Sequence, residues 1–258
     1  MIRAENITKT FGEQEVLQGI TFDFEAGKNN LIIGRSGAGK TVLLKILVGL
    51  QTPTSGTVWY DDVDFTSLDK EGMRAIRMKI GMLFQGSALF DSLTVEQNIR
   101  FPLDMFTTMN LRQKVERVNY CLERVNLADT NAKFPNELSG GMQKRVGIAR
   151  AIVLEPKYLF CDEPNSGLDP KTSILIDELI SSITEEQNIT TIINTHDMNS
   201  VMESGDNICF LHEGQLEWSG SKAEVLDSDN ENLQSFIFAS PFLQRLRKAA
   251  VGNGVFKG

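Results

Sequence analysis

The sequence lacks the features of a disulfide-bonded, secreted or membrane-spanning chain. Its three cysteines, Cys121, Cys161 and Cys209, lie far apart, with no CxxC pair and no metal-ligand spacing. Free thiols in a reducing compartment are the simplest interpretation, with a disulfide as the alternative. The stretch from Met1 to Gln14 carries charges where a signal peptide needs apolar residues, and no apolar run approaches the roughly 18 residues of a membrane span. We therefore expect any membrane contact to be peripheral or to pass through partners.

Positive charge is also scarce. The chain has 26 Lys and Arg residues against 34 Asp and Glu, a formal net charge of -8. This balance argues against broad nucleic-acid binding, so we expect no nucleic-acid partner, although a local basic patch remains an alternative. With 41% hydrophobic residues over 258 positions, the chain can bury a core in about one or two domains.

The most informative feature is a glycine-rich stretch, GRSGAGKT, which fits the phosphate-loop pattern G-x-x-x-x-G-K-[ST]. It lies between the apolar run 31–33 and the helical pattern 42–47. Its glycines allow a tight turn that points backbone N–H groups at phosphate oxygens, at a helix N-terminus. We predict a nucleoside triphosphate site, rather than a glycine-rich turn that fits by chance. The residues expected around the phosphates are Gly34, Arg35, Ser36, Gly37, Ala38, Gly39, Lys40, which would reach the outer phosphates, and Thr41, whose hydroxyl would bind Mg²⁺.

The apolar pattern predicts two kinds of sheet. Alternating apolar residues in segments 2–7 and 20–24, with a third segment at 57–60, predict an antiparallel layer beside the phosphate loop. Strand-like runs then alternate with helices such as 171–186, which predicts a parallel sheet covered on both faces. These runs are 79–84, a candidate central strand, 158–161, 190–193 and 207–211.

Strand signals are missing between about 86 and 154, where we expect an inserted helical subdomain. One of its helices should bury a single apolar face, formed by residues at helical spacing: Leu111, Val115, Val118, Leu122 and Val125. A helix over 138–151, with Ser139 as its N-cap, is expected to close the subdomain.

An acidic pair, Asp162 and Glu163, directly follows the apolar run 158–161. This places both carboxylates at the C-terminal end of a strand, where ligands bind in such sheets. Asp162 can hold Mg²⁺ through water opposite Thr41, and Glu163 can position and polarise an attacking water. Because phosphoryl transfer needs mainly in-line positioning and charge neutralisation, this pair with Lys40 and Mg²⁺ would support slow hydrolysis. A carboxylate that only caps a strand is the alternative for Glu163.

The segment LSGGMQ, residues 138–143, supplies the decisive pattern. In order, the phosphate loop, LSGGMQ and FCDEP resemble the ATP-binding cassette (ABC) ATPases over about residues 1–227. The resemblance implies an α/β fold: a RecA-like phosphate-loop core with an antiparallel β subdomain and an inserted α-helical subdomain. It implies ATP hydrolysis with Mg²⁺ as cofactor. Residues 228–258 are expected to form a C-terminal extension.

The resemblance also assigns roles to single positions. Phe11 matches the adenine-stacking aromatic, with a loop residue tucked into the core as the alternative. Gln85 matches the Q-loop glutamine, which would contact Mg²⁺ or the attacking water. His196 matches the switch histidine at the γ-phosphate, although position alone would equally suit a structural histidine. Residues 166–169 match the D-loop, which makes Asp169 a further nucleotide-site residue. The resulting catalytic set is Lys40, Gln85, Glu163 and His196, and the metal set is Thr41, Gln85 and Asp162.

Ser139, Gly140 and Gly141 resemble the signature motif of the family. There it forms a helix N-terminus that meets the γ-phosphate bound by the opposite protomer. The resemblance therefore implies a homodimer with ATP enclosed between two chains. ATP should drive this dimerisation and hydrolysis should release it, a movement that coupled partners can use.

The segment GSALFDSLTV, residues 86–95, narrows the resemblance to the MlaF-type ATPases of MCE-type lipid transporters, which include the bacterial Mla phospholipid system. SGGM followed by Lys144 and Arg145 agrees with this. The implied partners are a polytopic MlaE-like permease, an MlaD-like MCE-domain protein and, as a further candidate, a small cytoplasmic regulatory subunit. The implied location is cytoplasmic, peripheral on the inner membrane. Two features depart from the pattern: Asn165 stands where Thr is commoner, and the tail 228–258 matches no motif.

Other assignments compete with lipid transport. A mechanotransmitting ATPase that controls cell-wall hydrolases, or a small-solute importer, would carry the same motifs. A soluble ABC protein of DNA repair or translation would normally show paired cassettes, a long coiled coil or a basic surface. In the tail, Phe242, Leu243 and Leu246 predict a short amphipathic helix that either packs on its own domain or binds the second protomer or a regulatory partner.

Overall fold

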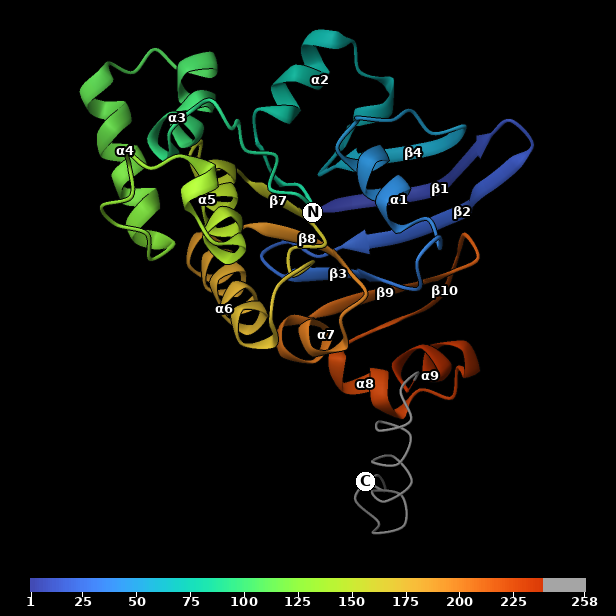
Figure 1. Ribbon diagram of the computed structural model, residues 1–258. Coiled ribbons are helices and arrows are strands. Elements are labelled where there is room, and N and C mark those ends of the chain that lie inside the picture. Colours follow the sequence, from blue (N-terminus) through green and yellow to red (C-terminus); the bar gives the residue numbers. More distant parts are fainter. Residues whose placement is uncertain (239–258) are drawn as a thin grey trace.

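A six-stranded sheet forms the centre of the molecule, with the strand order β10-β9-β3-β8-β7-β6 (Figure 1). The computed structural model describes residues 1–238, so the predicted helix around Leu243 lies outside it. The strands of the central sheet are β3 (Asn29–Ile33), β6 (Ile80–Leu83), β7 (Tyr158–Asp162), β8 (Thr190–Thr195), β9 (Asn207–His212) and β10 (Gln215–Gly220). Neighbouring strands pair in parallel, except β9 and β10, which are antiparallel.

The strands β3, β7 and β8 are buried along their whole length, as expected where both faces of a sheet are covered. Successive side chains of a strand point to opposite faces. Along β3, Leu31 and Ile33 pack into one apolar cluster, whereas Ile32 packs into another. The sheet thus separates two cores, and its C-terminal edge is where the loops with the predicted site residues begin.

The second sheet is antiparallel, with the order β2-β1-β4-β5, as the alternating segments predict. Its strands are β1 (Ile2–Phe11), β2 (Gln14–Phe24), β4 (Ser55–Tyr60) and β5 (Val63–Asp64). Alternate residues of β1, among them Ile2 and Ala4, are fully buried on its inner face. They share an apolar cluster with Leu43 and Leu47 of α1 (Lys40–Leu47), so this helix is packed beneath the antiparallel layer.

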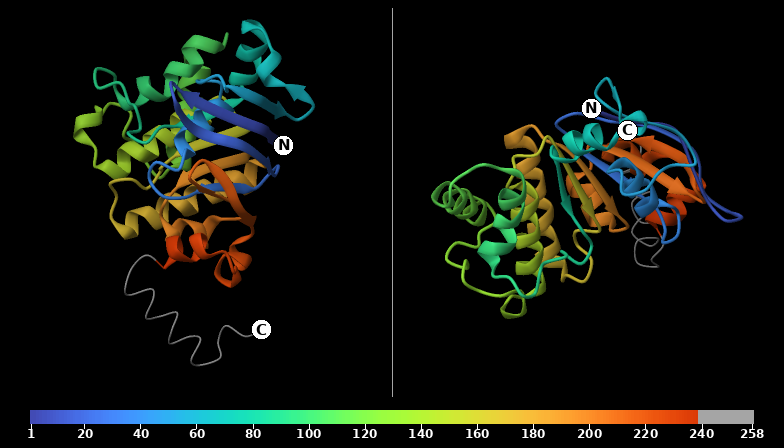
Figure 2. Two further views of the ribbon diagram at one scale, coloured as in Figure 1. Left: turned by 90° about the vertical axis from the view of Figure 1, so that its right-hand side faces the viewer. Right: turned by 90° about the horizontal axis from the view of Figure 1, so that it is seen from above.

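The remaining helices cover the sheets and form the region around residues 86–154. They are α2 (Lys70–Arg77), α3 (Val95–Phe106), α4 (Leu111–Arg124), α5 (Gly140–Ile152), α6 (Pro170–Gln187), α7 (Met198–Ser204), α8 (Lys222–Asp227) and α9 (Glu231–Ile237), with 3-10 turns η1 (Phe65–Ser67) and η2 (Pro135–Glu137). Figure 2 shows α3, α4 and α5 gathered on the side of the molecule away from the β1–β2 hairpin. Among residues 1–238, no helix is both long and apolar enough to cross a membrane.

Three details differ from the sequence-based expectations. The strand expected at 79–84 is β6, but it lies at the edge of the sheet and pairs only with β7, so its placement as a central strand was wrong. Leu111 is 63% exposed because it is the first residue of α4, and the buried face of that helix is formed by Val118, Cys121 and Leu122. The polar residues 228–232 are not all linker, since Asn230 caps α9 by accepting from the Leu233 N–H.

Candidate functional site

A cavity of about 760 Å³ lies over the phosphate loop, within the size range of small-ligand sites. It brings together residues from six separate parts of the chain. The lining residues are Val16, Arg35, Ser36, Gly37, Gly39, Lys40, Thr41, Val42, Gln85, Glu163, His196 and Phe236. All four residues of the predicted catalytic set are among them. The carboxyl ends of β3, β6, β7 and β8 thus converge on one cavity, as expected for a parallel sheet.

The phosphate loop has the tight conformation that its glycines allow. Gly34 has φ +148°, and a Cβ there would collide with the backbone oxygen of Leu211. Gly39 has φ +98° and directly precedes α1, so the loop ends at a helix N-terminus with free N–H groups. The Lys40 ammonium donates to the backbone oxygens of Gly34 at 2.8 Å and Arg35 at 3.2 Å. The loop therefore folds around its own lysine.

Lys40 is the cation of the cavity floor. Its ammonium nitrogen lies 4.0 Å from Oε1 of Glu163, and the side chain is only 7% exposed. Burial lowers the pKa of Lys40, while the nearby carboxylates of Glu163 and Asp162 act in the opposite direction. If the ammonium exchanged these hydrogen bonds to backbone oxygens for contacts with a phosphate, it would gain stronger, charge-assisted hydrogen bonds.

Thr41 and Asp162 form an oxygen-rich corner suited to Mg²⁺. The Thr41 hydroxyl lies 3.4 Å from Oδ1 of Asp162, and Nδ2 of Asn194 donates to both, at 3.2 and 2.6 Å. Within residues 1–238, no cluster of three or more His, Cys, Asp or Glu side chains could enclose an ion by itself. This fits Mg²⁺, which is usually bound through one or two protein oxygens together with substrate phosphates and water. Asn194 was not predicted from the sequence, because an amide at a strand end carries no motif.

The side chains of Glu163 and His196 contact each other at the wall of the cavity. Nδ1 of His196 lies 2.7 Å from Oε2 of Glu163, and the His196 side chain is 64% exposed. Glu163 has φ +49°, a left-handed conformation that is uncommon for glutamate. Its N–H donates to the backbone oxygen of Asn194 at 2.8 Å, which fixes the turn after β7. The carboxylate is thereby held between an imidazole and an ammonium.

Lys144 ties the helical region to this cavity. Its ammonium group is buried and donates to the backbone oxygens of Gln85 and Glu163, the latter at 3.3 Å. Burial lowers the pKa of Lys144. One lysine on α5 therefore fixes the main chain of two predicted catalytic residues. The sequence indicated Lys144 only as a subgroup marker, because a lysine within a helix is normally a surface residue.

Several predicted site residues do not line the cavity. Ser139 and Gly140 are exposed at the N-terminus of α5, where Ser139 Oγ accepts from the Met142 N–H at 3.3 Å, confirming the predicted cap. Asp169 instead caps α6, accepting from the Thr172 N–H at 3.1 Å. Phe11 is 45% exposed on the β1–β2 hairpin, with the Lys9 ammonium 5.0 Å from its ring centre. The nucleotide contacts predicted for Phe11, Ser139, Gly140, Gly141 and Asp169 stay predictions.

The C-terminal helix α9 adds an unpredicted wall to the cavity. Phe236 lines it, and its ring centre lies 5.5 Å from that of Phe210 on β9. The neighbouring Ser235 hydroxyl accepts from the Arg35 guanidinium at 2.9 Å. The phosphate loop is therefore in direct contact with the segment beyond residue 227, which the sequence suggested only as an extension.

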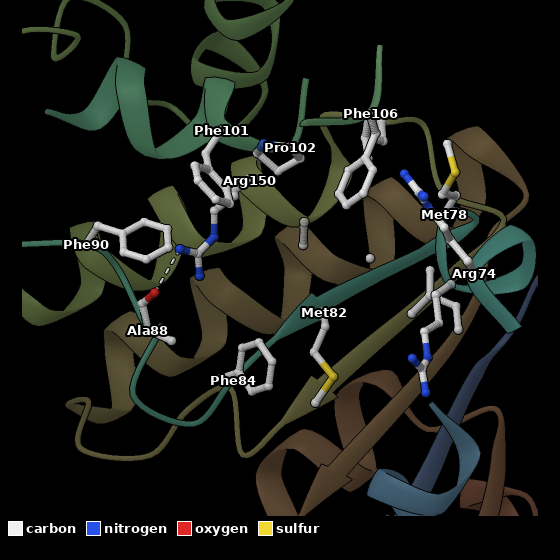
Figure 3. Close-up of a pocket in the computed structure, with 15 residues that line it drawn as sticks. Arg74, Met78, Met82, Phe84, Ala88, Phe90, Phe101, Pro102, Phe106 and Arg150 are labelled. Carbon is white, nitrogen blue, oxygen red and sulfur yellow. Dashed lines mark hydrogen bonds between the residues drawn. The ribbon is translucent and has the colours of Figure 1, made fainter. Parts of the chain in front are cut away.

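A second, apolar cavity of about 570 Å³ is lined by Phe84, the residue before Gln85 (Figure 3). We call it the apolar groove. It is bounded by α2, β6, the loop after β6, α3 and α5, and Figure 3 shows Phe84, Phe101 and Phe106 around it. The apolar groove is lined by Arg74, Arg77, Met78, Ile80, Gly81, Met82, Phe84, Ala88, Phe90, Phe101, Pro102, Phe106, Arg150, Ala151 and Leu154.

The loop between groove and cavity is held in a strained conformation. Ser87 and Ala88 both have positive φ, at +60° and +47°. The Arg150 guanidinium donates to the backbone oxygens of Ser87 at 2.6 Å and Ala88 at 2.8 Å. Strained backbone that is fixed by specific contacts is typical of segments that move or bind in function.

Fold and site together define a phosphate-loop nucleoside triphosphatase with an inserted helical region. The family model described as "ABC transporter" matches residues 17–166. The chain therefore belongs to the ABC transporter family, and it is an ATPase. The comparisons thus confirm the predicted fold class and enzyme class.

Similar proteins of known name are transport ATPases. The chain is 36% identical over 236 residues to the probable ribonucleotide transport ATP-binding protein mkl of Mycobacterium leprae, covering 92% of this chain and 68% of that protein. It is 39% identical over 227 residues to the methionine import ATP-binding protein MetN of Caulobacter vibrioides, covering 87% and 68%. These names support a transporter subunit and not a particular cargo.

Solved structures give the same family. The dimeric, post-hydrolysis ATP-binding cassette MJ0796 with bound ADP and Pi superposes with a TM-score of 0.79 at 33% identity, covering 86% of this chain and 99% of that one. The cbiO1 subunit of the cbiONQ transporter complex from Clostridium perfringens gives 0.82 at 29% identity, covering 96% and 98%.

Proposed function

We propose that two copies of this chain enclose two ATP molecules and drive a polytopic permease that moves phospholipid or another lipid. One observation carries the coupling part of this proposal: the consecutive residues Phe84 and Gln85 line the apolar groove and the nucleotide cavity, respectively. A partner segment bound in the groove would therefore change the nucleotide site by displacing one short loop.

For hydrolysis, we assign Glu163 as the general base. Its carboxylate faces the cavity between Lys40 and His196, so it can accept the proton of a water that attacks the γ-phosphate. Lys40 stabilises negative charge on the outer phosphates, and His196 orients the carboxylate. Mg²⁺, when held by Thr41 and Asp162 with Gln85 nearby, would neutralise the β- and γ-phosphate oxygens.

For dimerisation, we assign Ser139, Gly140 and Gly141 to the nucleotide of the second protomer. The exposed N-terminus of α5 does not line the cavity of its own chain, yet free N–H groups at a helix N-terminus favour a phosphate. The dimeric state of the similar cassette MJ0796 supports this arrangement. Each ATP would then be enclosed by one phosphate loop and one α5 N-terminus.

For coupling, we assign the apolar groove to a short helix of the permease. Aromatic residues such as Phe84 and Phe101 favour an apolar partner face, and the exposed Arg74 at the groove favours an acidic side chain beside it. The permease would be MlaE-like, with an MlaD-like MCE-domain protein in the assembled complex. The ATPase would then lie peripherally on the cytoplasmic face of the inner membrane.

The identity of the transported substrate is the most specific part of the proposal. Segment 86–95, which resembles the MlaF-type ATPases, forms the loop after Gln85 and supports lipid. The similarity to MetN of Caulobacter vibrioides favours a second candidate, import of a small solute such as an amino acid. The two candidates differ in their partners, because only the first requires an MCE-domain protein.

One variant tests the site and the partners together. Glu163→Gln should keep ATP binding and lose on the order of 10² or more in hydrolysis rate, because the amide cannot accept the proton. Glu178→Gln, an exposed neutralisation on α6, should hydrolyse normally and serves as control. A Glu163→Gln protein that hydrolyses at the parental rate would remove the general-base assignment.

The same tagged Glu163→Gln chain, purified with ATP from solubilised membranes of its own host, should recover a polytopic permease and an MCE-domain protein, identified by mass spectrometry. A solute-binding protein in place of the MCE protein would replace lipid by small-solute import. A partner tied to cell-wall hydrolases would replace transport by mechanotransmission.

A further inference from the structure

Asn165, the residue that departs from the family pattern, lies at the centre of a buried polar network. Its Nδ2 donates to both carboxylate oxygens of Asp177 on α6 and to the Ser200 hydroxyl on α7, each at 2.9 Å. Asn165 is 8% exposed, Asp177 3% and Ser200 0%. None of the three lines the nucleotide cavity. We call these three residues the Asn165 network.

The Asn165 network joins the two segments that carry the catalytic pair. Asn165 belongs to the turn after β7, in which the Ser166 N–H donates to the backbone oxygen of Glu163 at 3.1 Å. Ser200 belongs to α7, which begins at Met198, shortly after His196. Asp177 lies on α6, which packs against α7, and from there it contacts both segments. A shift at Asp177 would therefore be transmitted to both sides of the Glu163–His196 contact.

The carboxylate of Asp177 is placed where ionisation is costly. Burial raises the pKa of Asp177 to about 6, although hydrogen bonds from Ser200 and Asn165 act in the opposite direction. The acidic side chains that face it from α7 and its N-cap, Asp197 and Glu203, raise the pKa further. The thiol of Cys161 on β7 is also near, and burial raises the pKa of that thiol. We therefore expect Asp177 to change charge near pH 6.

The amide of Asn165 can respond to that change. Its Oδ1 is buried and has no hydrogen-bond partner, although a buried carbonyl oxygen normally has one. An ionised Asp177 accepts from Nδ2, as observed. A protonated Asp177 carries an O–H that can donate to Oδ1 once the amide turns over. Each charge state of Asp177 thus favours its own orientation of Asn165.

We propose that Asp177 is a positioning residue for ATP hydrolysis: when ionised, it fixes the Asn165 amide and with it the turn that carries Glu163, and when protonated, it releases that orientation. ATP turnover then falls as pH drops below about 6, independently of the groups that touch the nucleotide. ATP binding is unaffected, because the network does not reach the phosphate loop. The inference rests on the proposed role of Glu163 as general base.

The test compares pH profiles of kcat and KM for the full-length protein and three variants. Asp177→Asn keeps the shape and removes the titration. Because its neutral amide resembles the protonated carboxyl, kcat should stay near the low acid-pH value of the parent at every pH, so that the two profiles differ mainly above about pH 6. Asp177→Leu leaves the Asn165 amide without its acceptor, so kcat at pH 7.5 should fall about ten-fold with KM within about two-fold. Glu178→Gln, on the same helix, should match the parent at every pH.

Two outcomes would overturn the proposal. In the first, Asp177→Asn keeps the parental fall in kcat at acid pH, which means that another group titrates. In the second, Asp177→Leu unfolds at lower temperature but turns over ATP at the parental rate, which means that the network only stabilises the fold. If Asp177→Leu does not fold, the Asp177→Asn profile decides alone. Failure of the general-base assignment is recognised separately, because Glu163→Gln would then remain active.

Discussion

More than half of the lining of the nucleotide cavity comes from the contiguous stretch 35–42, whereas the apolar groove is assembled from α2, β6, α3, α5 and the loop after β6. In the cavity, backbone groups and a few charged side chains point in fixed directions. In the groove, aromatic and sulfur-containing side chains provide apolar contact surface. Within residues 1–238, only the loop from Phe84 to Ala88 contributes to both sites.

The difference fits what each site would recognise under the proposed function. Phosphate oxygens need N–H groups and cations at set positions, and a tight glycine turn before a helix provides them within a few residues. A protein partner is bound by complementary shape and a few anchoring side chains, which any set of elements can provide. The phosphate-binding part of the cavity is therefore local in the sequence, whereas the lining of the groove depends on the tertiary fold.

The largest effect is expected at Lys40, where the local motif has its one buried cation. Lys40→Ala should weaken MgATP binding on the order of 10²-fold and abolish turnover, because a buried, hydrogen-bonded charge is lost. Isothermal titration calorimetry measures the affinity. Lys45→Ala, an exposed lysine of the same helix, should bind as the parent does. Unchanged affinity in Lys40→Ala would show that the motif does not carry the binding chemistry.

An intermediate effect is expected in the apolar groove. Phe101 lies on α3, with its ring centre 5.0 Å from that of Phe90, and it does not line the nucleotide cavity. Phe101→Ser should reduce recovery of the permease in co-purification about ten-fold or more, because an aromatic anchor is lost. ATPase activity of the isolated chain should stay within about two-fold of the parent, since the phosphate site is unchanged.

The matched control for the groove is Leu111→Ser, which removes an apolar side chain that is 63% exposed on α4. Permease recovery should be the same as for the parent chain. Equal losses in both variants would mean that general surface hydrophobicity, and not the groove, holds the partner. A fall in the basal ATPase activity of Phe101→Ser would mean that the two sites are less separate than their linings indicate.

The same contrast explains how much could be predicted from the sequence. The phosphate loop, the strand before Asp162 and Glu163, and the Ser139 cap were predicted correctly, because each depends on neighbours within a few residues. The central placement of β6 was wrong, because an edge strand that is covered by helices has the same apolar sequence as a central one.

Residues that act through tertiary contacts were missed. Asn194 donates to Thr41 and Asp162, and Lys144 donates to the main chain of Gln85 and Glu163. Each of the two belongs to a regular strand or helix and fits no motif. The partner of Asn165 is Asp177, twelve positions further along the chain, and only packing of α6 brings them together. The apolar groove left no sequence signal, because its residues come from elements spread between Arg74 and Leu154.

The smallest effect is expected at Phe236, where a distant element completes the local motif. Phe236→Ala should weaken MgATP binding about three-fold, because the cavity loses one apolar wall while the phosphate loop keeps its charges and N–H groups. Asn232→Ala, on the same helix but bonded to Glu217, should bind as the parent does. Thermal unfolding without nucleotide is measured in parallel, since Phe236 also packs against Phe210. A lower Tm with parental affinity would show that Phe236 only stabilises the fold. Nucleotide binding would then depend on the phosphate loop without a contribution from α9.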